Sequence, residues 1–289
     1  MTEAKTIKSA SLKKRMSKRN SISIPMNCIL IILSIIFLFP IVWMFFSSFK
    51  GYIELFKYPP TLLPESFDPV NYVTAFKTGN WLIFFKNSAI VTVLSTIICV
   101  AISVMGGYAF AKYKFKGSNA LFLIFIATLM LPLEVLMIPI FIMVKKMGLY
   151  NSLWGLIIPP AATPFGIFLV RQHYLSIPNE YMQSARIDGA KEWQIFVHIM
   201  LPAGKSVMSC LAIFSALWRW NDYMWPLLVV RNTDKYTVQL ALATFQGQFN
   251  VDWQTIMAMS VVTMVPMLIV FVIFQKQIIN GMALSGLKE

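Results

Sequence analysis

The chain has 289 residues, of which 57% are hydrophobic and only 13% are charged. Soluble domains average about 45–50% apolar and about 25% charged residues, so this composition excludes an ordinary soluble domain and predicts a multi-pass membrane protein. The formal net charge of +13 would suit a nucleic-acid-binding protein, but basic residues of membrane proteins gather in cytoplasmic loops, so their distribution decides between the two.

Long apolar runs predict an all-α fold of six membrane-spanning helices, each long enough to cross about 30 Å of hydrocarbon. A basic tail, residues 1–26, comes first, and a short tail, residues 276–289, comes last. The expected spans of the membrane domain between them, residues 27–275, lie at about 27–49, 87–111, 118–144, 147–170, 206–230 and 254–275. Near the end of the second span, the pair Gly106-Gly107 predicts close helix packing.

The distribution of Lys and Arg predicts the orientation of these spans. With the N-terminus in the cytoplasm, sixteen basic residues lie on the cytoplasmic side, eight on the other side and Arg219 within a span. The positive-inside rule therefore places both termini, and the polar segment 177–202, in the cytoplasm. Because the basic tail leads directly into a span, we expect it to be a cytoplasmic tail and expect no binding to nucleic acid.

The polar segment 177–202 has the pattern of two short helices joined by a turn. Pro178 suits the first turn of a helix, and Asp188-Gly189 suits its end, because glycine can take the left-handed conformation of a C-cap. Pro202 ends the second helix. Apolar side chains recur at helical spacing on both sides of the turn, at Tyr181, Met182 and Ala185 and at Trp193, Phe196, Val197 and Met200. A partly apolar hairpin outside the membrane is suited to docking on another protein.

This hairpin also resembles the EAA loop of permease subunits in binding-protein-dependent ATP-binding-cassette importers. That pattern is Glu-Ala-Ala, three residues, Gly, nine residues, then Ile-x-Leu-Pro. Gln183, Ser184 and Ala185 hold the first three places, so two of the three namesake residues differ, whereas the rest of the pattern keeps its spacing. The resemblance implies that the hairpin couples the chain to an ATPase subunit through Glu180, Ala185, Asp188, Gly189, Ile199, Leu201 and Pro202.

Other stretches extend the resemblance over nearly the whole chain. FPIVWMFFSSFK, KNSAIVTVLST, WNDYMWP and INGMALSGLKE look like the carbohydrate-uptake branch of these permeases, and the chain length is similar to that of the shorter partner of the permease pair. The resemblance implies a heterodimer with a second permease, two ATP-binding cassette ATPase subunits, and an extracellular solute-binding protein. It also implies a carbohydrate solute and a location among the lipids of a bacterial cell membrane.

Three polar residues inside the predicted spans are candidates for the solute path. Glu134 lies in the third span, and Asn221 and Asp222 lie in the fifth; ionisable groups at such depth usually face the bundle interior or a water-filled path. A purely structural role is an alternative for two of them. Glu134 could pair with a neighbouring helix or lie at the external interface, and Arg219, three residues before Asp222, could satisfy that carboxylate.

The external segment 231–252 is long for a simple connector. By the resemblance, it reaches towards the solute-binding protein, and its aromatic and amide side chains are candidates for that contact. They are Tyr236, Phe245, Gln248 and Phe249.

The sequence offers little support for catalysis by the chain itself. His173 and His198 have no His or Cys at ligand spacing, and no Gly-rich loop with a Lys is present to hold a phosphate. We therefore expect no cofactor or metal on this chain, with ATP and Mg²⁺ bound by partner subunits. A secondary transporter or channel of six spans, and a membrane enzyme, remain as alternatives. Copurification with an ATPase and a second permease would separate these classes.

Overall fold

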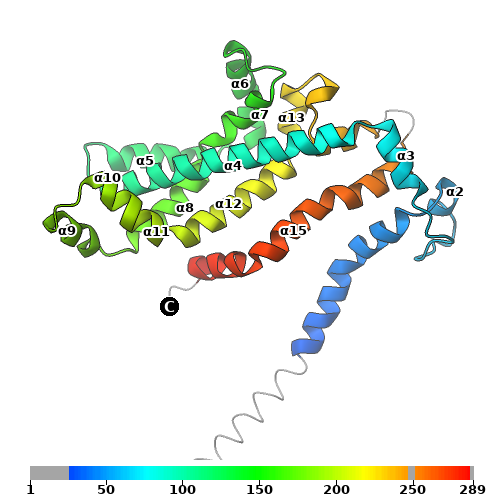
Figure 1. Cartoon of the computed structure of the whole chain (residues 1–289), viewed down its shortest axis with the longest axis horizontal. Helices are drawn as coiled ribbons and strands as arrows, with labels where there is room; N and C mark the ends of the chain where they lie inside the picture. The colour runs from blue at the N-terminus through cyan, green and yellow to red at the C-terminus, as the bar shows by residue number, and fades with distance from the viewer. Residues whose placement is uncertain (1–25, 247–250, 287–289) are drawn as a thin grey trace, which may run out of the picture. The chain divides into compact units, whose positions relative to one another are not determined.

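The computed structural model describes residues 26–246 and 251–286, with side chains as far as residue 275 (Figure 1). All named elements of this part of the chain are helices, which confirms the all-α prediction there, and one isolated antiparallel bridge joins Gln246 to Val251. After the helix Met26–Ser47, the elements are α2 (Tyr52–Leu55), α3 (Val70–Thr78), α4 (Trp81–Lys112), α5 (Ser118–Ala127), η1 (Thr128–Met130), α6 (Leu133–Lys146), α7 (Leu153–Ile157), η2 (Pro159–Ala161), α8 (Pro164–Leu175), α9 (Glu180–Ile187), α10 (Glu192–Ile195), η3 (Phe196–Met200), α11 (Leu201–Ala203), α12 (Lys205–Trp220), α13 (Met224–Val229), η4 (Thr233–Lys235), α14 (Val238–Thr244) and α15 (Trp253–Gly286).

Four helical segments are long and apolar enough to cross a membrane by themselves. They are Met26–Ser47, Trp81–Lys112, Leu153–Leu175 and Trp253–Gln275. Two bent pairs, Ser118–Met130 with Leu133–Lys146 and Glu192–Ala203 with Lys205–Trp220, raise the number of candidate spans to six if each pair counts as one. The described chain therefore has the composition of a multi-pass membrane protein, with four to six spans.

The third predicted span, 118–144, is not a straight helix. Its two halves meet at 109° between Met130 and Leu133. Leu131 is extended, with ψ of 128°, as residues before proline prefer, and Pro132 has no N–H with which to continue the helical hydrogen bonds. Pro132 thus marks a break, whereas Pro139 lies inside α6, and the pair of helices is either a broken span or a re-entrant segment.

The other predicted span boundaries also differ from those of the helices. α4 begins at Trp81, before the expected start of the second span, and α12 ends at Trp220, so that Asn221 interrupts the expected fifth span 206–230. At the other end of the chain, α15 continues to Gly286, through most of the expected tail 276–289. Apolar composition thus located the helices, whereas their ends depend on caps and breaks.

The described chain forms two compact units. The first comprises residues up to 74 together with 253–261. In it, the segment after the helix Met26–Ser47 folds back on the end of that helix, because the Asn71 amide donates to the carbonyl oxygens of Ser48 and Lys50, both at 2.9 Å. The ring of Tyr72 lies 5.4 Å from that of Phe49.

The second unit comprises residues 75–252 and the chain from 262 onward. Its central element is α4, along which α8 and α12 pack (Figure 1). The helices approach closely at Gly107, where a Cβ would come within 2.6 Å of Val170 in α8. The expected close packing at this glycine is therefore present. Two clusters of buried apolar residues lie along α4, one of which joins it to the hairpin 177–202.

Candidate functional site

The segment 177–202 forms the expected pair of short helices. α9 ends at Ile187, Gly189 takes a left-handed φ of +83°, and α10 begins at Glu192. A Cβ at Gly189 would meet nothing within 4 Å, so backbone conformation alone favours glycine there. Pro178, expected in the first turn, instead precedes Asn179, the N-cap of α9.

The second arm of the hairpin changes its helical winding before Pro202. Residues Phe196–Met200 form a π-helix, and Pro202 follows in α11. Pro202 has no N–H to donate to the carbonyl one turn earlier, so a regular α-helix could not be completed across it. The change of winding sets which side chains of this arm face the rest of the chain.

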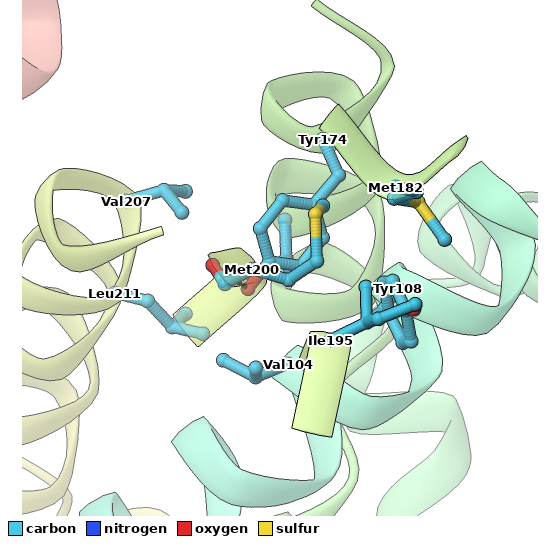
Figure 2. Packing of buried hydrophobic residues seen from close by; sticks show 9 residues of the cluster. Val104, Tyr108, Tyr174, Met182, Ile195, Met200, Val207 and Leu211 are labelled. Atoms are coloured by element: carbon cyan, nitrogen blue, oxygen red, sulfur yellow. Dashed lines mark hydrogen bonds between the residues drawn. The ribbon is translucent and has the colours of Figure 1, made fainter. Parts of the chain in front are cut away.

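One side of the hairpin is packed into the second unit. Met182 is 2% exposed, and Ile195 and Met200 are fully buried. Figure 2 shows these side chains gathered with Tyr108 of α4 and Tyr174 of α8. The remaining buried members of the cluster are Val104, Val170, Val207 and Leu211. The hairpin is thus fixed to three long helices, α4, α8 and α12, by apolar contacts.

The opposite side of the hairpin carries four exposed apolar side chains. Ile187 is 86% exposed, and Tyr181, Trp193 and Val197 are 61%, 59% and 42% exposed. The helical spacing had grouped Tyr181 with Met182 on the first arm, and Trp193 and Val197 with Met200 on the second. The structure separates the members of both groups. On the second arm, Ile195 takes the buried position and the π-helix shifts the register after it. We call these four residues the outward face. Such clusters commonly mark protein contacts.

A polar network ties the hairpin to the end of α4. The Tyr113 hydroxyl donates to a Glu192 carboxylate oxygen at 2.6 Å, and Tyr113 and Tyr108 share a second hydrogen bond of 3.2 Å. Arg186 of α9 donates twice to the same carboxylate, from Nε at 2.6 Å and Nη2 at 3.1 Å. Burial, and then the hydrogen bond to Glu192, raise the pKa of Tyr113 well above its usual value, so this hydroxyl remains a donor at neutral pH.

A second polar contact holds the start of the hairpin. The Lys112 ammonium donates to the Ile177 carbonyl at 2.6 Å and to the Asn179 side chain at 2.9 Å. Tyr174 adds a hydrogen bond of 3.2 Å to the Met200 carbonyl. The roles of Lys112, Tyr113 and Glu192 were missed in the sequence, because their partners lie 65 to 79 residues away and no local spacing predicts the pairs.

The residues that the resemblance assigned to coupling lie in different settings. Glu180, Asp188 and Gly189 are exposed at the start and the turn of the hairpin, and Pro202 is exposed at its end. Ala185, Ile199 and Leu201 are half-buried against the apolar cluster. This set therefore contains residues that can reach a partner and residues that hold the hairpin in place.

The candidate path residues lie at helix breaks rather than inside helices. Glu134 is exposed in the first turn of α6, directly after the break at Pro132. Asn221 is exposed at the end of α12, where its amide donates to the Leu217 carbonyl at 2.9 Å. Asp222 accepts a hydrogen bond of 3.2 Å from the Trp225 N–H and lies 3.7 Å from Arg219. These contacts favour the structural alternative for Asp222.

The segment 231–252 is partly helical and is anchored on α4. The Asn87 side chain donates to the carbonyls of Asp234 and Tyr236, at 2.9 and 3.0 Å, and the Phe245 ring stacks on Trp81 at 5.6 Å. Tyr236 and Phe245 are both half-buried by these contacts. The other two candidates for binding-protein contact, Gln248 and Phe249, lie outside the described residues.

The described side chains offer no group of three or more His, Cys, Asp or Glu that could hold a metal ion. The hairpin presents a rigidly held apolar surface with ionic groups beside it, and no arrangement of an acid, a base and a nucleophile is built on it.

Comparison with known proteins gives a consistent result. Residues 100–283 match the family described as binding-protein-dependent transport system inner membrane component. The chain is 35% identical over 259 residues to the arabinooligosaccharides transport system permease protein AraQ of Halalkalibacterium halodurans, covering 89% of this chain and 93% of that protein. It is 31% identical to the diacetylchitobiose uptake system permease protein NgcG of Streptomyces coelicolor, covering 89% and 86%.

A solved structure has the same fold. A chain of a bacterial ABC transporter involved in the import of the acidic polysaccharide alginate superposes with a TM-score of 0.78 at 25% identity, covering 87% of this chain and 94% of that chain. A second structure of a bacterial alginate ABC transporter, in complex with an alginate pentasaccharide-bound periplasmic protein, superposes with a TM-score of 0.64 at 16% identity, which shows the fold alone.

Proposed function

The chain belongs to the family of binding-protein-dependent transport system inner membrane components, and from this membership we propose that it is the permease subunit of an ATP-driven carbohydrate importer. The named relatives support the solute class, since they are permease proteins of systems for arabinooligosaccharides, diacetylchitobiose and lactose. The chain would form half of the translocation pathway, and a second permease would form the other half.

The hairpin 177–202 would couple this permease to an ATPase subunit. The observation that carries this proposal is the difference in burial between the two sides of the hairpin. Ile195 is fully buried against the chain, whereas Ile187 and Trp193 are 86% and 59% exposed. An exposed apolar surface on a hairpin that is locked to three long helices can receive a displacement and pass it on. ATP and Mg²⁺ would be bound by the ATPase subunits.

The proposed topology has six spans with both termini in the cytoplasm. The bent pair Ser118–Met130 with Leu133–Lys146 would then be one span, and Lys205–Trp220 would begin another, with Glu192–Ala203 left in the cytoplasmic hairpin. The excess of Lys and Arg on the side of the hairpin supports this orientation. An external solute-binding protein would deliver the carbohydrate on the opposite side. The protein would thus be a multi-pass protein of the bacterial cell membrane.

Copurification tests this function directly. The tagged chain, expressed from its own operon and solubilised in mild detergent, should bring down an ATPase and a second permease in stoichiometric amounts. Reconstituted in vesicles, this complex should take up a labelled oligosaccharide only when ATP and the binding protein are both supplied. A tagged chain that purifies alone, and moves solute along an ion gradient without ATP, would instead support the secondary-transporter alternative.

A further inference from the structure

A cavity of about 160 Å³ lies at the end of the helix Met26–Ser47, within the first unit. Its wall includes three aromatic rings, those of Trp43, Phe56 and Trp253, together with the side chain of Lys50. Phe56 is 57% and Trp253 39% exposed, so part of the aromatic wall is open to the surroundings. The cavity therefore presents flat apolar surfaces beside a cationic group.

The cation in this wall forms no ion pair with any side chain that the structure describes. Lys50 is only 2% exposed, its ammonium donates to the Thr61 carbonyl, and Nζ lies 5.0 Å from the centroid of the Trp43 ring. Among the described side chains, no carboxylate lies within ion-pair distance of this ammonium. An ammonium carries three N–H donors, and a buried cation without a counter-ion is costly. A ligand with an anionic oxygen would supply what the site lacks.

A second polar group in the same wall also lacks a partner. The Thr61 hydroxyl is buried, and no hydrogen-bond partner for it exists within the described part of the chain. A hydroxyl can donate to an anionic oxygen, and such charge-assisted bonds are stronger than neutral ones. The uncompensated charge of Lys50 and the unpaired hydroxyl of Thr61 are independent observations, and both point to a ligand that accepts hydrogen bonds.

We propose that this cavity binds an anionic oxygen group, a carboxylate or a phosphate, on a ligand whose ring or hydrocarbon surface packs on the aromatic wall. The cavity lies where the apolar helix Met26–Ser47 ends and where the apolar helix Trp253–Gln275 begins, and the proposed topology places these helix ends at the membrane surface. Two sources of this chemistry meet there: an acidic sugar in solution and the phosphate of a lipid headgroup.

The two sources can be tested on the intact complex in detergent, after delipidation. Saturation-transfer NMR would measure binding of sodium glucuronate, with glucose as the uncharged control. Native mass spectrometry would measure binding of short-chain phosphatidylglycerol, with short-chain diacylglycerol as the phosphate-free control. The variant Lys50→Met removes the cation, and Lys57→Met is the matched control, because Lys57 is an exposed lysine paired with Glu65 outside the cavity.

Lys50→Met should weaken binding of the anionic probe at least about tenfold, as expected for loss of a hydrogen bond to a charged group, and Lys57→Met should not. Thr61→Val should weaken it less, about threefold. Glu54→Gln should tighten it, because the Glu54 carboxylate also lines the cavity and repels an anion. The last two variants retain Lys50, so they test the site even if Lys50→Met fails to fold.

Binding of glucuronate alone would identify a soluble acidic sugar as the ligand, and binding of phosphatidylglycerol alone would identify a lipid. Binding of both would establish the anionic group as the recognised feature. If wild-type complex bound neither probe, or if Lys50→Met bound as well as wild type, the proposal would be overturned. These measurements need neither ATP nor a solute-binding protein, so their outcome is independent of the proposed import function.

Discussion

Glu192, in the second helix of the hairpin, accepts a hydrogen bond of 2.6 Å from the hydroxyl of Tyr113, which follows the last residue of α4. The same carboxylate receives both donors of Arg186 from the first helix. One side chain thus joins the two arms of the hairpin to each other and to the longest helix of the second unit. A movement of the hairpin should therefore be passed to α4.

This relationship predicts the effect of Tyr113→Phe, which removes the donor and keeps the ring. The stability of the hairpin should fall by about 1 kcal/mol, below the range of about 1.5–3 kcal/mol for bonds to charged groups, because Glu192 is exposed. Transport per ATP hydrolysed should fall, whereas the ATPase should still copurify. Transport and ATPase rates in vesicles measure this coupling.

Two further variants make the Tyr113 test specific. Glu192→Gln should act in the same direction and more strongly, because it also weakens the pair with Arg186. Tyr113→Phe should have a smaller effect in the Glu192→Gln background than alone, because the two changes share the Tyr113–Glu192 interaction. Tyr58→Phe is the control, since this tyrosine is 94% exposed and lies far along the chain from the hairpin. Normal coupling in both the Tyr113→Phe and the Glu192→Gln variants would rule out a role for this hydrogen bond.

The turn of the hairpin predicts a graded series at Gly189. Its φ of +83° is strained for most residues, whereas the surrounding space is open. Gly189→Val should therefore cost about 1–2 kcal/mol and uncouple transport, Gly189→Ala should cost less, and Gly189→Asn should be nearly neutral because asparagine tolerates this conformation. ATP-dependent uptake should follow the same order, with insertion and assembly of the chain retained. Wild-type uptake by the valine variant would contradict the prediction.

The outward face predicts that ATPase binding depends on exposed rather than buried residues. Trp193→Ala should weaken copurification of the ATPase by about 2 kcal/mol, roughly thirtyfold, as for an aromatic residue central to an interface. The thermal stability of the Trp193→Ala permease should change little, because Trp193 is 59% exposed.

Two controls separate docking from folding. Leu82→Ala removes an apolar side chain that is 79% exposed in the first turn of α4, and it should leave copurification unchanged. Ile195→Ala empties a fully buried position and should lower stability by about 2–5 kcal/mol. Equal loss of the ATPase in the Trp193 and Leu82 variants would show that general surface hydrophobicity, and no specific docking surface, is responsible.

Sequence reasoning succeeded where the cause is local. The left-handed Gly189 and the two short helices follow from the spacing of a few neighbouring residues, and Gly107 does pack closely against α8. Sequence reasoning failed where tertiary contacts decide which side chains are buried. Ile195 rather than Trp193 is buried together with Met200, because the π-helix after Ile195 changes which residues of this arm share a face. The break at Pro132 could be predicted from the proline itself, whereas the angle of 109° between the two helices could not, because apolar residues continue on both sides of the break.

Asn221 gives the last prediction, which concerns the solute path. Its side chain is exposed at the end of α12, and its only described bond is to the Leu217 carbonyl of its own helix, so the amide is free to move towards a passing hydroxyl group. In a background without Cys28, Cys99 and Cys210, the variant Asn221→Cys should react with a small water-soluble thiol reagent. Saturating carbohydrate should slow that reaction severalfold. Ser215→Cys, at a position 3% exposed, is the control and should remain unreactive. Reaction at 221 that the solute leaves unchanged would mean that the position is wet but off the path, and complete inertness in every transport state would mean that it packs against protein or lipid.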